Sequence, residues 1–557
     1  MTAYDLKSLN LPRLYGTQLE LFASVVENPL GQALLMGSLL ENGGIPKLRR
    51  LPLNEPPTLY PIEASPVQDN TPLAPISLES LKDHPHPPIP YLTIRDYAEA
   101  YHNRKIDPLE IAEKVLAAVG ASEKLEPPLR AFIAMQREDI LAQASAAAER
   151  LRQGKPLSIF DGVPVAVKDE IDMQPYPTTV GTNFMGKQPP RPDSTVAARL
   201  RAAGALLIGK ANMHEIGINP NGSNIHYGRA ANPWDLQRDT GGSSSGSAAA
   251  VAAGLCPVAI GADGGGSIRI PAGLCGLVGL KASFGRVSER GAAPLGWSVA
   301  HLGPIGASVE DVMLAYAAIA GPEAGETLTL RQPRPNLADW DNPNLTGVRL
   351  GVYREWNEHA EPQITAACNA MLANLVKAGA TLVEITIPEL DAMRIAHAVT
   401  ILAEMAAAMH PYLEQGEKFA PSTRLSLMIG KVLSSRDYLQ AQRMRTRAMR
   451  IFDEIFKQVD AVLTPATGQV APIIPPQALA KGWSDLSSDT ELMRFIFPAN
   501  LVGLPAITFP AGYTGEGIPI GMQAIGRYWE EHVLLRLAYA AETFAERRTP
   551  PVFYRVI

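Results

Sequence analysis

The 557-residue chain is too long for one ordinary hydrophobic core of about 100–200 residues, so we expect several lobes or one unusually large α/β unit. Hydrophobic residues make up 46% of the chain and charged residues 19%, a composition typical of a soluble globular enzyme. Fifty basic residues against 56 acidic ones give a net charge of −6, which argues against a nucleic-acid partner.

The N-terminal residues lack a basic region followed by an apolar core, so we expect no signal peptide. Residues 240–262 carry no charge over a length that could cross a bilayer, but they begin with glycine and serine and are otherwise rich in alanine. We therefore expect buried core there and no transmembrane helix. The chain has three cysteines, Cys256, Cys275 and Cys368, and they lack metal-ligand spacing. Their odd number and spacing indicate neither a disulfide scaffold nor a zinc module, and we expect the protein to be in the reducing cytoplasm.

Residues 17–40 predict two short helices. Thr17 is a plausible N-cap for the first, Asn28-Pro29 begins the second, and Gly43-Gly44 ends it. No basic residue lies between Arg13 and Lys47, which disfavours electrostatic capture by anionic lipid. We expect this N-terminal helical pair, residues 1–50, to pack on the body of the chain, to contact a second copy, or to make peripheral contact with a membrane.

Residues 51–90 contain eleven prolines and predict an extended linker. From residue 91 to 557 we expect one catalytic domain in which helices alternate with short apolar strands. Such strands are buried on both faces of a sheet, which predicts an α/β fold with a large mixed, mostly parallel sheet covered by helices. The strands are expected near residues 164–167, 205–208, 257–260, 348–352 and 460–463, and the helices near 140–152, 194–203, 364–378, 438–459 and 532–544.

Two glycine- and serine-rich segments carry the strongest chemical signal. Residues 240–254 form a Gly/Ser loop that opens directly into an alanine-rich helix, whose N-terminus offers free N–H donors. In the second segment three glycines, 264–266, precede Ser267, and consecutive backbone N–H groups there could hold the oxyanion formed when Ser267 attacks a carbonyl. Asp263 and Arg269 flank this turn and could hold its shape by pairing, although a purely structural turn is the alternative.

Lys168 ends an apolar strand and is followed by Asp169. A lysine in that position is usually a solvated strand end. No histidine lies close in sequence to either serine segment, however, and a serine nucleophile needs a base. A desolvated, neutral lysine can serve as that base. We find no residue set that predicts a metal or a cofactor, since His214-Glu215 lacks a second histidine at ligand spacing.

The Lys168-Asp169 strand end and the blocks at residues 241–254, 261–272, 275–281, 500–512 and 517–526 resemble the amidase signature family over about residues 95–545. The resemblance implies an amidohydrolase with a Ser-Ser-Lys unit of Lys168, Ser243 and Ser267, and no cofactor. It also implies an oxyanion hole made by the backbone N–H groups of Gly264, Gly265, Gly266 and Ser267. Ser245 replaces a glycine that many members have.

The order of the two serines stays open. One reading of the resemblance makes Ser243 the nucleophile and Ser267 the proton relay to Lys168, with a cis peptide bond before Ser267. The local chemistry favours Ser267, whose own turn supplies the donors, and Ser267 is our first choice for the acyl-enzyme. Ser244, Asp263 and Arg269 are expected to support the site.

Residues 16–22, 94–101, 209–215 and 492–495, together with the helix that begins at Pro29-Leu30, are similar to the plant-type fatty acid amide hydrolases. This resemblance implies fatty acid amide substrates such as N-acylethanolamines, and an N-terminal helical pair that helps to form a homodimer and an apolar substrate entrance. The alternatives are a general amidase for small or aryl amides and a glutaminase-type amidotransferase subunit. An α/β-hydrolase with Ser244 as nucleophile is disfavoured because residues 232–239 cannot form the buried strand it needs. A nucleotide-binding scaffold is disfavoured because the sequence contains no G-x-x-x-x-G-K-[ST] motif and the glycine turn at 264–269 does not match G-x-G-x-x-G.

Overall fold

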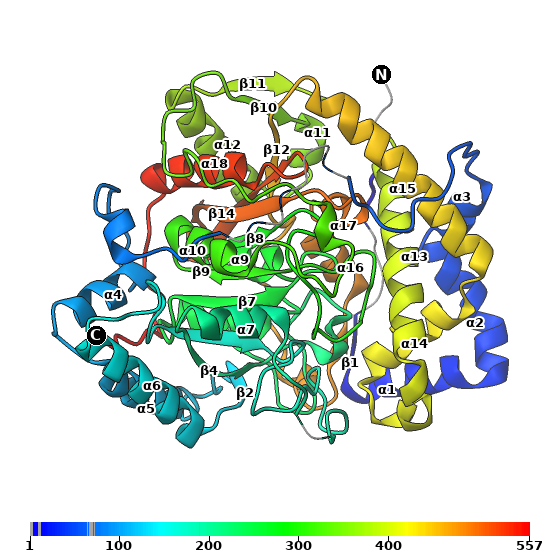
Figure 1. The fold of residues 1–557 in the computed structure, drawn as a ribbon. Helices are drawn as coiled ribbons and strands as arrows, with labels where there is room; N and C mark the ends of the chain where they lie inside the picture. The colour runs from blue at the N-terminus through cyan, green and yellow to red at the C-terminus, as the bar shows by residue number, and fades with distance from the viewer. Residues whose placement is uncertain are drawn as a thin grey trace.

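The computed structural model describes residues 4–8, 13–63, 65, 69, 71, 73–188 and 190–557, and an eleven-stranded sheet runs through the middle of these residues (Figure 1). In spatial order its strands are β11 (Thr381–Glu384), β10 (Arg349–Val352), β12 (Ala461–Pro465), β15 (Pro519–Gly526), β14 (Ala506–Tyr513), β8 (Val278–Lys281), β9 (Leu302–Gly306), β7 (Val258–Ala262), β3 (Pro164–Lys168), β4 (Leu206–Ala211) and β2 (Phe132–Ala134). Two small ladders lie outside it: β1 (Leu14–Tyr15) with β13 (Trp483–Ser484), and β5 (Ala231–Asn232) with β6 (Asp235–Asp239).

The predicted α/β architecture with a large mixed sheet is confirmed, but the prediction of a mostly parallel sheet is wrong. Of the ten neighbouring strand pairs in the described sheet, four are parallel and six are antiparallel. One antiparallel pair, β2 with β4, lies at an edge of the sheet, and the other five form its middle, from β12 to β7. Their strands are buried on both faces, so their apolar runs resemble those of parallel strands and do not reveal direction.

The helices are α1 (Gly16–Glu27), α2 (Pro29–Asn42), α3 (Ile45–Arg50), α4 (Ile94–His102), α5 (Pro108–Ser122), α6 (Arg137–Arg152), α7 (Thr195–Ala202), α8 (Ser245–Ala252), α9 (Arg269–Leu274), α10 (Val309–Ile319), α11 (Arg354–Asn357), α12 (Pro362–Lys377), α13 (Leu390–Ala408), α14 (Pro421–Val432), α15 (Ser435–Phe456), α16 (Leu486–Met493), α17 (Phe497–Leu501) and α18 (Glu531–Phe544). One row of helices, α7, α10, α18 and α12, packs along the sheet, while α8 and α9 pack on strands beside the candidate site. The five helices and five strands expected in the catalytic region are all present, with boundaries shifted by a few residues.

The N-terminal helices lie beside a layer made by α13, α14 and α15 (Figure 1). Asn28 caps α2 by accepting a hydrogen bond from the Leu30 N–H at 3.0 Å, as the sequence predicted. The first helix begins two residues earlier than expected, with Tyr15 and not Thr17 at its N-cap. The inward face of α1 packs on α14, and α3 packs on α13 and α15.

Residues 51–60 run along α15 without regular secondary structure. Arg447 on α15 forms an ion pair with Glu55 at 3.0 Å, and the Arg443 guanidinium donates to the Leu53 and Glu55 carbonyls. This part of the expected linker is therefore held against the body of the protein. In the described part of the chain, no helix is long and apolar enough to cross a membrane.

The topology explains why two distant segments meet. Strands β3 and β7 are parallel neighbours, with Val165 opposite Val258 and Val167 opposite Ile260. Their carboxyl ends therefore reach the same edge of the sheet. This places Lys168, at the end of β3, beside the turn that follows β7.

Candidate active site

Lys168 is fully buried, and its Nζ atom contacts three oxygen atoms. It lies 2.9 Å from Ser243 Oγ, 3.3 Å from the Ala262 carbonyl oxygen and 2.9 Å from Glu170 Oε2. The lysine predicted as the base is therefore desolvated and in direct contact with one of the two predicted serines. A buried amine of this kind can take a proton from a hydroxyl group.

Ser243 and Ser244 precede α8, as the Gly/Ser loop predicted. The Ser243 carbonyl accepts a hydrogen bond from the His214 N–H at 3.1 Å. The peptide bond between Gly242 and Ser243 is cis. The expectation of a cis bond before Ser267 is therefore wrong: it precedes the other serine.

Ser244 joins the two serine segments. Its Oγ donates to the Ala262 carbonyl at 3.2 Å and accepts from the Ala262 N–H at 3.3 Å, and its N–H donates to the Ser267 carbonyl at 3.2 Å. All these groups are buried. Ser244 thus holds the start of α8 against the end of β7, which is a structural task.

Asp263 organises the turn that carries Ser267. The predicted pair with Arg269 is present: Arg269 Nε lies 2.9 Å from Asp263 Oδ2, and the pair is completely buried. The Arg269 guanidinium and the amide of Asn500 favour the ionised carboxylate so strongly that the pKa of Asp263 lies far below its usual range despite burial. The same carboxylate accepts from the Gly266 N–H at 2.6 Å and from the Ile268 N–H at 3.2 Å.

This arrangement corrects one part of the predicted oxyanion hole. The Gly266 N–H is already bonded to Asp263, so it is not free to bind a substrate oxygen. Gly266 has φ +105°, a conformation that favours glycine, and this turns its N–H toward the carboxylate. Among the described residues the N–H groups of Gly264, Gly265 and Ser267 have no hydrogen-bond partner.

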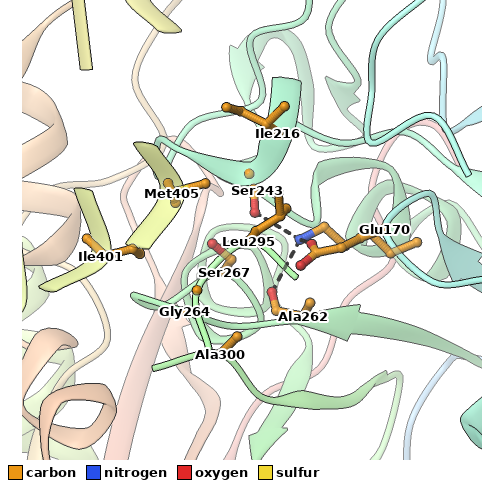
Figure 2. Close-up of a pocket in the computed structure, with 13 residues that line it drawn as sticks. Glu170, Ile216, Ser243, Ala262, Gly264, Ser267, Leu295, Ala300, Ile401 and Met405 are labelled. Carbon is orange, nitrogen blue, oxygen red and sulfur yellow. Dashed lines mark hydrogen bonds and ion pairs between the residues drawn. The ribbon is translucent and has the colours of Figure 1, made fainter. Parts of the chain in front are cut away.

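A small cavity of about 20 Å³ lies over these groups, and apolar side chains form part of its lining. Ser243 and Ser267 lie between Glu170 on one side and Ile401 and Met405 on the other, and Ile216 lies beyond Ser243 at the top of the view (Figure 2). Leu295 also lines the cavity. No residue in the described structure forms a hydrogen bond with Ser267 Oγ, which faces this space.

The sequence analysis did not predict two residues of the site, Glu170 and His397. Glu170, which contacts Lys168, lies two positions after it on the turn that leaves β3. His397, on α13, has its Nε2 2.8 Å from the Gly264 carbonyl oxygen. The only sequence signal for Glu170 is its short distance from Lys168, and His397 has none, because it is 130 residues from the turn.

Other polar residues near the motifs face elsewhere. Asp169 points away from Lys168 and accepts hydrogen bonds from the N–H and hydroxyl groups of Thr179 and the Gly181 N–H. His214 is buried with its Nδ1 2.9 Å from the Glu215 carbonyl, and burial lowers its pKa to about 4. No group of metal-binding side chains occurs within the described residues. His214 is therefore a neutral core residue.

Comparisons with known proteins identify the family of this chain. A family model described as Amidase matches residues 113–535. The chain is 38% identical to a fatty acid amide hydrolase of Arabidopsis thaliana, over 100% of this chain and 96% of that protein, and 43% identical to one of Medicago truncatula, over 84% and 79%.

Solved structures show the same fold. The native peptide amidase of Stenotrophomonas maltophilia is 27% identical and superposes with a TM-score of 0.70, over 84% of this chain and 99% of that chain. The matched segment includes Lys168, both serines and the turn between Asp263 and Arg269. The chain therefore belongs to the amidase family and is an amide-cleaving hydrolase.

Proposed function

We propose that this chain hydrolyses fatty acid amides through an acyl-enzyme formed on Ser267, with Ser243 as proton relay and Lys168 as base. The observation that carries the chemistry is the 2.9 Å contact between Lys168 Nζ and Ser243 Oγ in a buried pocket that Ser267 also lines. Ser243 Oγ accepts a hydrogen bond from Lys168 Nζ, whereas the Ser267 hydroxyl has no hydrogen-bond partner among the described residues and is available to attack. The similarity to two plant fatty acid amide hydrolases supports the substrate class.

The proposed reaction moves one proton along three side chains. Ser267 Oγ attacks the amide carbonyl carbon, its proton passes to Ser243 Oγ, and the Ser243 proton passes to Lys168 Nζ. The free N–H groups of the 264–267 turn stabilise the oxyanion. When the C–N bond breaks, the proton returns through Ser243 to the leaving amine. Water then attacks the acyl-enzyme with the same relay, which releases the carboxylic acid and regenerates Ser267.

The apolar surroundings favour a hydrocarbon acyl group. Ile216, Leu295 and Met405 belong to a buried apolar cluster that continues through Phe184 to Leu427 on α14. The cavity itself holds little more than one water molecule, so an acyl chain must displace side chains such as Met405 to follow this cluster. Methionine suits such a position because its flexible side chain adapts to different shapes.

The path continues toward the N-terminal helices. Leu427 lies on α14, and α1 packs on α14. The outer surface of α1 and α2 exposes four apolar side chains: Leu21, Val25, Leu30 and Leu34, the last of them 80% exposed. We assign this N-terminal apolar face to contact with a second copy of the chain. The absence of any lysine or arginine from residues 14–46 disfavours an anionic lipid surface.

A substrate profile tests the proposed function. Purified enzyme should be assayed with N-acylethanolamines whose acyl groups run from two to about twenty carbons, and with aryl and small primary amides. We expect kcat/KM to rise by about fourfold per added methylene until the acyl path ends, since each buried CH₂ contributes about 0.8 kcal/mol. A flat chain-length profile with equal or better turnover of small amides would assign the enzyme to the general amidases.

Sedimentation tests the N-terminal apolar face. We expect the intact enzyme to be a dimer and the Leu30→Gln/Leu34→Gln double variant to be a monomer. Leu109→Gln/Leu157→Gln, at exposed apolar positions elsewhere, is the matched control and should remain dimeric. A monomeric intact enzyme that co-sediments with neutral phospholipid vesicles, and loses this binding in the double variant, would assign the face to a membrane.

A further inference from the structure

Most of the backbone carbonyl groups in the turn between Asp263 and Ser267 have specific hydrogen-bond partners. The Asp263 carbonyl accepts from the Asn500 amide at 2.9 Å, the Gly266 carbonyl from the Ile270 N–H at 2.7 Å, and the Ser267 carbonyl from the Ser244 N–H. The N–H groups that stay unbonded in the described structure are those of Gly264, Gly265 and Ser267. A native protein seldom leaves several such donors unpaired in one turn unless a ligand completes them.

His397 supplies the partner of the Gly264 carbonyl. It projects from α13, is almost fully buried, and its Nε2 lies 2.8 Å from that carbonyl oxygen. A carbonyl can only accept, so Nε2 carries a hydrogen and donates. Burial lowers the pKa of His397 to about 4, so the ring is neutral at physiological pH and the tautomer with Nε2–H is the one that this contact requires.

A hydrogen bond to the carbonyl of a peptide group also fixes the direction of the N–H in the same group. The Gly264 carbonyl and the Gly265 N–H belong to the same planar trans peptide unit and point in opposite directions. A Cβ atom on Gly265 would come within 2.9 Å of the His397 ring, so the imidazole lies directly against this peptide. Rotation of the peptide would break the hydrogen bond to His397.

We infer that His397 is a positioning residue for the oxyanion hole: by holding the Gly264 carbonyl it aims the Gly265 N–H at the oxygen of the reacting amide. The inference rests on the proposed acyl-enzyme chemistry at Ser267. His397 does not touch the substrate and takes no proton. It acts through the peptide unit that it holds.

The same helix face also lines the acyl side of the pocket. His397, Ile401 and Met405 follow one another at intervals of four residues, so they lie along one stripe of α13. Ile401 and Met405 contact the cavity that Ser267 lines. One rigid helix therefore positions the oxyanion donor and bounds the space for the acyl chain, so both are fixed relative to one another.

The test compares His397→Gln with His397→Met. Glutamine retains an N–H donor at a similar reach, whereas methionine fills the space without a donor. We expect the methionine variant to lose about 10²-fold in kcat, the range found when one oxyanion donor is lost, with KM changed little. The glutamine variant should recover most of this loss. If the methionine variant does not fold, His397→Asn, whose amide is too short to reach Gly264, replaces it in the comparison.

Inhibitor binding separates positioning from general packing. A trifluoromethyl ketone forms a tetrahedral adduct whose oxyanion needs the N–H donors, while a fatty alcohol of the same length needs only the acyl path. We expect the donor-free variant to lose affinity for the ketone by about the factor lost in kcat and to keep its affinity for the alcohol. Equal losses for both ligands, or full activity in the donor-free variant, would overturn the inference.

A fluorophosphonate control separates this inference from the proposed function. Intact enzyme should be labelled on Ser267, and the donor-free variant should be labelled at the same residue but more slowly, because its serines and lysine are unchanged while the phosphonyl oxygen also needs the oxyanion donors. Labelling of the intact enzyme at another residue would refute the proposed function itself. Labelling at Ser267 together with unchanged kinetics in the variants would refute only the role of His397.

Discussion

Ser243 Oγ and Glu170 Oε2 each lie 2.9 Å from the same atom, the Nζ of Lys168. A neutral lysine amine has two N–H groups and one lone pair. If Glu170 and the Ala262 carbonyl accept the two N–H groups, the lone pair is left facing the Ser243 hydroxyl. Glu170 is therefore expected to orient Lys168 as a base.

Substitution of Glu170 tests this arrangement. Glu170→Gln keeps an acceptor oxygen beside the amine and should retain kcat within about tenfold, whereas Glu170→Met removes the acceptor and should lower kcat by about 10²-fold, the lower end of the effect of a positioned base. Steady-state kinetics on one long-chain amide measures both, and thermal unfolding shows whether each variant is folded. Equal activity of the two folded variants would contradict the orienting role.

The covalent intermediate gives the second prediction. A fluorophosphonate should label Ser267, and peptide mass spectrometry should locate the adduct. Ser267→Ala should abolish labelling, and Ser243→Ala should slow it, because the proton then lacks its relay to Lys168. An adduct on Ser243 would reverse the two roles, and an adduct on Ser244 would refute the Ser-Ser-Lys assignment.

The third prediction concerns the loss of Lys168. Lys168→Ala should fold but lose about 10²–10⁴-fold or more in kcat, the range that general base catalysis supplies. The removal also leaves Glu170 without its buried partner, so the Lys168→Ala/Glu170→Gln double variant is the control for stability. Near wild-type amide turnover in either variant would exclude Lys168 as the base.

The sequence was sufficient to identify the candidate site residues that lie within contiguous motifs. Lys168 ends a strand, and both serines follow glycine-rich segments, so their local conformation and the family resemblance pointed to the same groups. The ends of β3 and β7 meet because the strands are parallel, and this pairing is what joins the motifs.

The sequence could not show contacts that depend on packing between distant elements. His397 reaches Gly264 from a helix in another part of the chain, and no local pattern distinguishes it from other buried histidines. Which N–H groups of the turn are available to a substrate depends on the direction of the Asp263 carboxylate. Because this carboxylate accepts a hydrogen bond from the Gly266 N–H, Gly266 does not belong to the oxyanion hole that the sequence predicted. The direction of the central strands was equally hidden, since burial on both faces removes the alternation that marks many antiparallel strands.

The fourth prediction concerns the dependence of stability on pH. Asp489 on α16 is buried, accepts a hydrogen bond from the Asn221 amide at 3.0 Å and lies near Asp485 and Asp239. Burial raises its pKa to about 7, whereas the unfolded chain titrates near the usual aspartate value of about 4. The folded state therefore holds a proton that the unfolded state has lost, and the stability from this group falls as pH rises from about 4 to about 7.

Asp489→Asn should remove this dependence because its amide is never charged. We expect the melting temperature of the variant, relative to that of the intact enzyme, to increase as pH rises from 4 to 7. Above about pH 8 the difference between the two melting temperatures should be constant. Differential scanning calorimetry across this range measures the effect, and Asp485→Asn, which removes the neighbouring carboxylate at the N-cap of α16, is the comparison variant. A difference that does not vary with pH would contradict the prediction.

The acyl path gives the last prediction. Met405 lies between the cavity over Ser267 and the apolar cluster that leads to α14. Met405→Trp should fill the path beyond the first carbons of the acyl chain, so kcat/KM for long-chain amides should fall by at least tenfold while that for acetyl or propionyl amides changes little. Each methylene that can no longer be buried forfeits about 0.8 kcal/mol. Met405→Leu, a volume-conserving change, should keep the original profile and serves as the control. An equal loss of kcat/KM at every chain length in the tryptophan variant would mean that Met405 supports the catalytic groups and does not bound the acyl path.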